Sequence, residues 1–134
     1  MSTVQWTVEF AYLLEANKIS PIETFQIEAT KDEVTFEGSA SDAEYEQLAG
    51  EKPQIEGIIQ DEHIRFTKTY PHYYGSDENG KLFLDKTIPG HSVVYEGEWY
   101  EPKKHYEGDW FIEWIDEDGE VYHITGPWEM KASK

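Results

Sequence analysis

Three segments in the last third of the chain place an apolar or aromatic residue, a glycine and a tryptophan at every second position. They are Tyr95-Gly97-Trp99, Tyr106-Gly108-Trp110 and Ile124-Gly126-Trp128. In an extended strand, residues two apart share a face, so each segment would present a tryptophan beside a second large side chain. Buried rings offer large apolar areas, and tyrosine hydroxyls and indole N–H groups seek hydrogen-bond partners. The pattern predicts non-covalent binding of a small hydrophobic or aromatic ligand.

One cation accompanies these rings. Lys68 lies between Phe66 and Tyr70 in an alternating segment, so it shares their predicted inward face. An ammonium group there could neutralise a ligand carboxylate at a cavity mouth; the alternative is a rim lysine that reaches water. For the rings, the alternative is that they simply fill the interior of a barrel. The ligand-binding residues that we predict are Trp99, Trp110, Trp128, Tyr95, Tyr106, Phe66 and Lys68.

Catalytic and metal-binding motifs are absent from the sequence. The five histidines lack the spacing of a metal site, and no G-x-S-x-G elbow occurs. The acidic segments 77–80 and 116–119 lack the remaining ligands of a calcium loop and are predicted to be turns. We expect no catalytic residue, no metal and no cofactor. An enzyme with two carboxylates in the barrel mouth is an open alternative.

The charge of the chain limits its partners. Its 134 residues carry a net charge of −17, with 28 acidic against 11 basic residues, and Arg65 is the single arginine. Nucleic acids and anionic membranes require clustered basic residues, so neither is an expected partner. An acidic module that binds or inhibits a basic protein is a second alternative function. The chain has no cysteine, the start MSTVQWTVEF has no signal-peptide features, and no apolar run is long enough to span a membrane, so we expect a cytoplasmic protein.

Period-two alternation organises most of the chain and predicts one all-β domain over residues 1–134. The first strand is expected from Val4 to Leu14. The chain has about nine predicted strands in total, with turns every 8 to 12 residues. Residues 42–49 are the one helical segment, and Ser41 to Glu44 has the form of a capping box. The polar tract 71–80 is the longest predicted loop and could act as a lid.

The glycines of the repeated segments indicate a curved wall. Gly38 and Gly57 extend the same apolar-Glu-Gly pattern to two further strands. Glycine lowers strand propensity, so each one needs a compensating role. It could allow a strand to bend at a barrel corner, or leave space for a neighbouring ring. Both roles favour a closed antiparallel up-and-down barrel of about eight to ten strands, which also removes exposed sheet edges.

A meander barrel with Gly-x-Trp segments on its inner face resembles the calycin group, which contains lipocalins, avidin-type proteins and fatty-acid-binding proteins. The resemblance implies an interior ligand site. Two features depart from the group. Lipocalins carry Gly-x-Trp on the opening strand, where this chain has Val4-Gln5-Trp6, and the paired inward arginines of fatty-acid-binding proteins have no counterpart.

Several apolar residues fall on the predicted outward faces of the strands. If they gather, they would form a patch that a second copy could cover, so we expect a monomer or a homodimer. These residues are Leu13, Ile58, Val94, Tyr100, Phe111, Ile115 and Val121.

Overall fold

Eight strands form a closed antiparallel barrel in the computed structural model, which describes residues 2–115, 119 and 121–133, except the side chains of 113–115, 121 and 122. Around the barrel the order is β1-β10-β9-β8-β5-β4-β3-β2. The pairing of β1 with β10 closes it, for example through Val8 opposite Met130. The predicted all-β barrel is therefore confirmed. The strands are β1 (Ser2–Phe10), β2 (Glu23–Asp32), β3 (Thr35–Ala40), β4 (Gln54–Gln60), β5 (His63–Thr69), β8 (Ser92–Tyr100), β9 (His105–Ile115) and β10 (Val121–Ala132).

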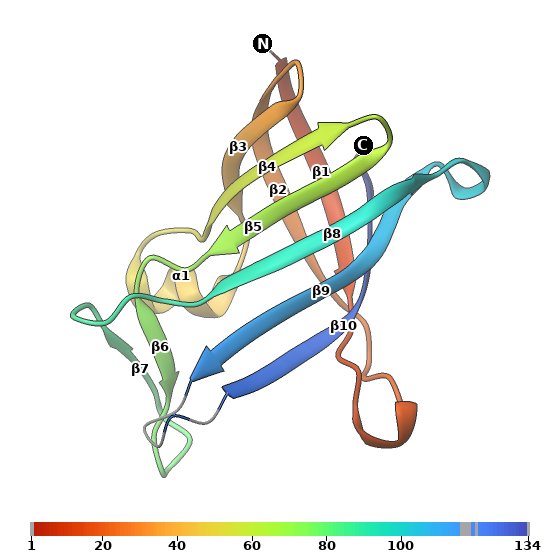
Figure 1. Cartoon of the computed structure of the whole chain (residues 1–134). Coiled ribbons are helices and arrows are strands. Elements are labelled where there is room, and N and C mark those ends of the chain that lie inside the picture. Colours follow the sequence, from red (N-terminus) through yellow and green to blue (C-terminus); the bar gives the residue numbers. More distant parts are fainter. Residues whose placement is uncertain (1, 116–118, 120, 134) are drawn as a thin grey trace.

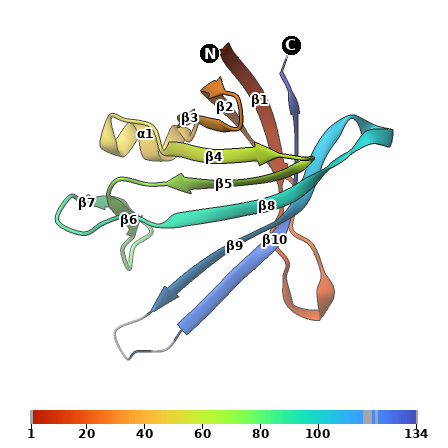
Figure 2. The ribbon, with the colours of Figure 1, turned by 45° about the horizontal axis from the view of Figure 1, so that its top comes forward.

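Two insertions interrupt the meander. Helix α1 (Ala43–Ala49) joins β3 to β4, and a hairpin of β6 (Tyr73–Ser76) and β7 (Leu82–Asp85) joins β5 to β8. Figures 1 and 2 show both insertions at one end of the barrel, with the two chain termini at the other. We call the first end the helix end.

Two predicted boundaries differ from the structure. The tract 71–80, predicted as a loop, contains β6, in which Tyr74 lies opposite Leu84 of β7. The first strand ends at Phe10 rather than Leu14, because pairing with β2 stops at Phe10 and Glu23. Beyond Phe10 the chain still bonds to β10, because Leu13 donates its backbone N–H to the carbonyl of Thr125, at 2.9 Å. The chain then passes a short 3₁₀ helix, Glu15–Asn17.

The helix forms where it was predicted, with a different cap. Asp42 is the N-cap: its carboxylate accepts from the backbone N–H of Tyr45 at 3.1 Å, and the Glu46 carboxylate accepts from the backbone N–H of Asp42 at 2.8 Å. Ser41, the predicted start of the capping box, instead accepts from the backbone N–H of Gln26 on β2. Gly50 ends the helix with a φ of 73°, in the left-handed region.

Aromatic rings fill the middle of the barrel. Phe66 and Tyr95 stack with their ring centroids 4.5 Å apart, and Trp128 meets both rings edge-on at 5.4 and 5.6 Å. None of these three side chains is more than 3% exposed. We call them the ring cluster. This part of the interior is a packed core.

The glycines lie where strands approach closely and rings need space. A Cβ on Gly97 would lie 2.2 Å from the backbone oxygen of Glu107 and 3.1 Å from the Trp128 ring. A Cβ on Gly126 would lie 2.9 Å from the indole nitrogen of Trp110. The predicted role of these glycines in making space for rings is confirmed.

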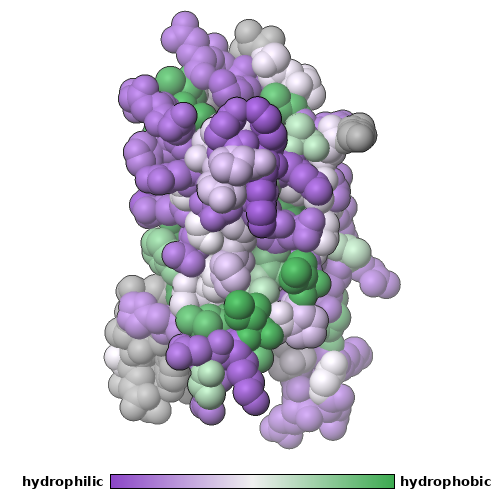
Figure 3. Space-filling model, turned by 90° about the vertical axis from the view of Figure 1, so that its right-hand side faces the viewer, coloured by the Kyte–Doolittle hydropathy of each residue, from purple (hydrophilic) through white to green (hydrophobic). Residues whose placement is uncertain are grey.

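The outer wall is mainly hydrophilic. On the face in Figure 3, hydrophobic side chains gather in the lower part, below a largely hydrophilic upper part. Among the residues predicted to face outward, Val94 and Phe111 are register partners, whereas Ile58 lies opposite Arg65. The side chains of Ile115 and Val121, and the predicted turn at 116–119 apart from Gly119, lie outside the described residues. Within the described part of the chain, no helix is long and apolar enough to cross a membrane.

Candidate functional site

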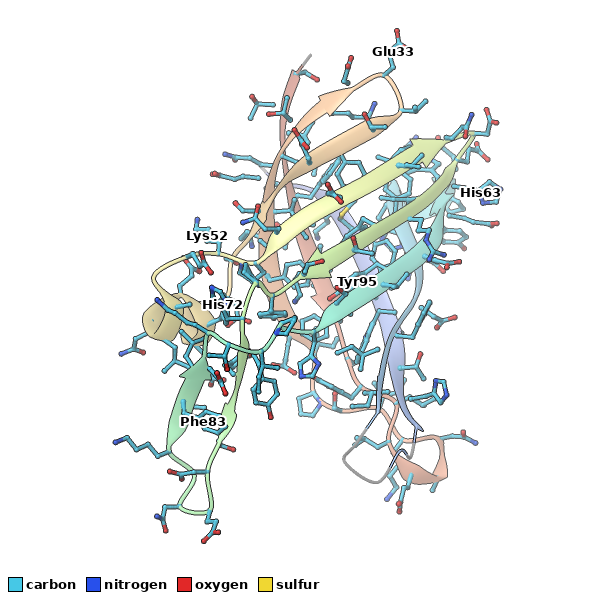
Figure 4. The ribbon with its side chains drawn as sticks, turned by 60° about the vertical axis from the view of Figure 1, so that its left-hand side comes forward. Glu33, Lys52, His63, His72, Phe83 and Tyr95 are labelled. Carbon is cyan, nitrogen blue, oxygen red and sulfur yellow. The ribbon has the colours of Figure 1, made fainter. Side chains whose placement is uncertain are left out.

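A cavity of about 760 Å³ lies inside the helix end of the barrel. Its walls come from β1, β2, β5, β8, β9 and β10, and the start of α1 and the β6–β7 hairpin contribute to its mouth. In Figure 4, His72 lies beside α1 and Tyr95 lies on β8, which marks this end of the molecule. The volume falls within the range of small-molecule sites, about 300–1,000 Å³. The barrel is therefore filled in its middle and hollow at one end.

Aromatic side chains form the walls and floor of the cavity. Tyr95 of the ring cluster is its floor and pairs in register with Trp110 on β9. Phe10 and Phe25 line the opposite wall, and Phe10 meets both Phe25 and Trp110 edge-on, at 5.7 and 6.1 Å between centroids. The Trp110 indole donates to the backbone carbonyl of Ala11 at 2.9 Å, which fixes its ring against the wall. These rings can pack against an apolar or aromatic ligand.

Lys68 lines the cavity from the end of β5. Its side chain is 5% exposed, and its Nζ lies 4.1 Å from the centroid of the Phe25 ring. Among the described residues, no hydrogen bond or ion pair reaches this ammonium group. Burial lowers the pKa of Lys68 to about 8, and the charges of Asp42 and Glu23 partly oppose that shift. The alternative of a rim lysine that reaches water is wrong, since the side chain is enclosed.

Four carboxylates surround the mouth: Glu23 at the start of β2, and Asp42, Glu44 and Glu46 at the start of α1. We call them the carboxylate rim. Asp42 is held from two sides, because its second oxygen accepts from the Tyr70 hydroxyl at 2.6 Å while the first caps α1. No carboxylate of the rim lies within ion-pair distance of Lys68 among the described residues.

Three phenols complete the mouth, and each has a raised pKa. For Tyr70 the cause is burial, followed by its hydrogen bond to Asp42. Burial and then the charges of Asp42 and Glu44 raise the pKa of Tyr74 to about 12. Burial, Glu23 and Asp42 raise the pKa of Tyr12. All three phenols are therefore protonated at neutral pH. Tyr70 donates its hydrogen to Asp42, whereas the hydroxyl groups of Tyr12 and Tyr74 can donate to a ligand.

The structure brings some of the predicted ligand-binding residues together and separates others. Tyr95, Trp110 and Lys68 line the cavity. Phe66 and Trp128 lie in the ring cluster, where the Trp128 indole donates to the carbonyl of Glu96 at 3.2 Å. Trp99 and Tyr106 contact each other at the opposite end of β8 and β9, with centroids 5.0 Å apart, and the Trp99 indole donates to Glu101 at 2.6 Å.

Strand direction explains this division. Gly97 and Gly108 are register partners on antiparallel strands, so the tryptophans two residues beyond them lie toward opposite ends of the barrel.

The carboxylate rim and Tyr70 were not among the site residues predicted from the sequence. Tyr70 had a usable signal, because it continues the alternation of Phe66 and Lys68. Glu23 and Asp42 had no such signal in the sequence. Glu23 lies at the mouth because it begins β2, and Asp42 because it caps α1.

Within the described part of the chain, no group of three or more His, Asp or Glu side chains is placed to hold a metal ion. Comparisons of the chain with protein families, with curated proteins and with solved structures find no match. The site must therefore be interpreted from its own geometry.

Proposed function

We propose that the protein binds a small aromatic or apolar molecule that carries an acidic group, without performing chemistry on it. The body of the ligand packs between Tyr95, Trp110 and the phenyl rings of the opposite wall. Its anionic group reaches Lys68. The observation that supports this most strongly is the ammonium of Lys68, which is buried, lines the cavity and lacks a carboxylate partner among the described residues.

A buried charge without a partner is costly, and proteins usually pair it or neutralise it. Here the ring of Phe25 supplies part of the lost solvation through a cation–π contact at 4.1 Å. A ligand carboxylate would supply the remainder as a charge-assisted hydrogen bond, which is stronger than a neutral one. The hydroxyl groups of Tyr12 and Tyr74 at the mouth can donate further hydrogen bonds to the same group.

The architecture is compatible with this role. The closed antiparallel barrel with one helix is consistent with a calycin-like fold, and we include that assignment in the proposal. The ring cluster seals the cavity from below, so a ligand can enter from the helix end. Fold alone does not define function, so Lys68 and the cavity are the features that support this role.

Titration calorimetry with two matched probes tests the proposal. Indole-3-propionate carries the anion, and indole-3-propionamide has the same ring without the charge. We expect the propionate to bind about tenfold or more tightly, since a hydrogen bond to a charged group contributes about 1.5–3 kcal/mol. Lys68→Met should remove this preference.

Lys86→Met is the matched control, because Lys86 is an exposed lysine and the substitution changes the net charge equally. It should leave the preference intact. The proposal is overturned if the wild-type protein binds neither probe, or if Lys68→Met binds the propionate as tightly as the wild type does.

A further inference from the structure

The mouth of the cavity holds more negative than positive charge. The carboxylate rim has four acidic side chains, whereas Lys68 is the lysine that lines the cavity below them. Asp42 and Glu46 take part in capping α1. Glu23 and Glu44 are exposed, and among the described residues their carboxylates have no hydrogen-bond or ion-pair partner. Half of the rim is therefore free to bind a ligand.

The rim acts on the groups around it. Burial is the main cause of the raised pKa values of Tyr12 and Tyr74, and the charges of Glu23, Asp42 and Glu44 add to it. Among the described residues that line the cavity, four carboxylates against one lysine give the mouth a negative electrostatic potential. A ligand that carries only an anion would meet this potential on its way to Lys68, and the net charge of −17 adds to the repulsion.

Opposite charges lie close together in the site without forming a pair. Asp42 and Glu23 are near enough to Lys68 to affect its ionisation, yet neither carboxylate lies within 4.0 Å of its nitrogen among the described ion pairs. The ammonium of Lys68 is enclosed in the cavity and comes from β5, whereas the rim carboxylates come from β2 and α1. A ligand with two adjacent opposite charges could contact both sides at once.

We propose that the ligand is a zwitterion on an aromatic or bulky apolar body, the arrangement found in an aromatic amino acid. Its carboxylate contacts Lys68, and its ammonium contacts the free half of the carboxylate rim, chiefly Glu23. The body lies deeper, against Tyr95 and Trp110. This inference rests on the proposed function, since it uses the same cavity and the same lysine, and it adds the cationic group.

Three probes with one ring system separate the two ideas: tryptophan, indole-3-propionate and tryptamine. They carry both charges, the anion alone and the cation alone. Titration calorimetry at neutral pH and low ionic strength should show tryptophan binding about tenfold more tightly than indole-3-propionate, since one charge-assisted hydrogen bond is gained. Tryptamine should bind more weakly than tryptophan because it leaves Lys68 without a partner.

Two variants assign the charges. Glu23→Gln should bring tryptophan and indole-3-propionate to similar affinities, and it removes no hydrogen bond among the described residues. Lys68→Met should remove the advantage of tryptophan over tryptamine. Glu37→Gln is the matched control, because Glu37 is an exposed acid on β3 that does not line the cavity, and it should change no affinity.

The outcomes are distinct. If indole-3-propionate binds at least as tightly as tryptophan and Glu23→Gln has no effect, the zwitterion inference is overturned while the proposed function stands. If tryptamine binds most tightly, Lys68 does not recognise an anion and both ideas fail. If none of the three probes binds, the proposed function itself is overturned.

Discussion

The Nζ of Lys68, on β5, lies 4.1 Å from the centroid of the Phe25 ring, on β2. Phe10 and Tyr70 also present their rings to this ammonium group, at 5.7 and 5.4 Å. These contacts replace part of its hydration. The replacement is incomplete, since burial still lowers the pKa of Lys68. The charged residue best placed to bind a ligand is thus one that weakens the fold.

Lys68→Met should therefore stabilise the ligand-free protein. Burial lowers the pKa of Lys68 from 10.5 to about 8, and at about 1.4 kcal/mol per pKa unit the buried charge costs on the order of 3 kcal/mol at neutral pH. Methionine has a similar shape without the charge. Urea denaturation at pH 7 should show a higher free energy of unfolding for Lys68→Met and no change for Lys86→Met. A lower value for Lys68→Met would contradict the argument.

The same stability difference should depend on pH. The unfolded chain keeps the Lys68 proton up to a pH near 10.5, whereas the folded protein releases it near pH 8. Between these values the unfolded state binds more protons, so this group makes the wild type more stable as the pH rises. The advantage of Lys68→Met should be full at pH 7 and mostly lost by pH 10. The other titratable groups that face the cavity are present in both proteins, so the difference between the two stability curves reports chiefly on Lys68: Tyr12, Glu23, Asp42, Glu44, Glu46, Tyr70, Tyr74, His91 and Tyr95.

Tyr70→Phe should loosen the connection between the barrel and α1. The Tyr70 hydroxyl donates to Asp42 at 2.6 Å, and without it one oxygen of a half-buried carboxylate has lost its partner. The expected loss of stability is about 1–3 kcal/mol. Tyr73→Phe is the control, because no hydrogen bond of the Tyr73 hydroxyl is found among the described residues, and it should change stability by less than about 0.5 kcal/mol. Thermal and urea unfolding measure both; equal effects would contradict the role of this hydrogen bond.

Gly97→Ala tests the close packing of β8 on β9. The added Cβ would lie 2.2 Å from the backbone oxygen of Glu107, so two paired strands must separate. The loss should reach or exceed about 3 kcal/mol, the upper range for overpacking. Gly75→Ala, in the β6–β7 hairpin, meets first the flexible end of the Tyr73 side chain, at 3.1 Å, and should be nearly neutral. A similar small loss for both variants would show that the wall can adapt.

The barrel was predictable because period-two alternation encodes which residues face inward. Val8, Ile27 and Phe66 all occupy buried positions on their predicted faces. The repeated glycines were also informative, since their spacing reflects register partners such as Gly97 and Gly108. Both signals are local in the sequence, since each lies within one strand or between two strands that follow each other along the chain.

The site was only partly predictable, because it depends on which strand ends meet. Trp99 and Trp110 occupy the same place in their repeats, yet Trp110 lines the cavity and Trp99 contacts Tyr106 at the other end. Asp42 reaches the mouth through the position of α1, and its hydrogen bond to Tyr70 spans 28 residues of the chain. The spacing of Asp42 and Tyr70 in the sequence does not predict this contact.

Tryptophan emission can locate a bound ligand, because Trp110 lines the cavity whereas Trp99 contacts Tyr106 at the other end of the barrel. We choose 4-iodobenzoate as the probe, since it has an aromatic body, a carboxylate for Lys68 and an iodine atom that quenches an excited indole on contact. A ligand in the cavity contacts Trp110 and not Trp99. The fraction of emission that saturating probe removes should fall in Trp110→Phe, which has lost the contacted emitter. It should rise in Trp99→Phe, which has lost an emitter that the probe does not reach.

Two controls test whether the change in quenching comes from binding in the cavity. Trp110→Phe also loses the hydrogen bond to Ala11, so its unfolding curve must show a folded protein under the conditions of the titration. Lys68→Met should reduce quenching at every probe concentration below saturation without altering either tryptophan. The opposite pattern, with Trp99→Phe losing the quenched fraction and Trp110→Phe retaining it, would place the ligand at the far end of the barrel. That result would remove the cavity at the helix end from consideration as the binding site.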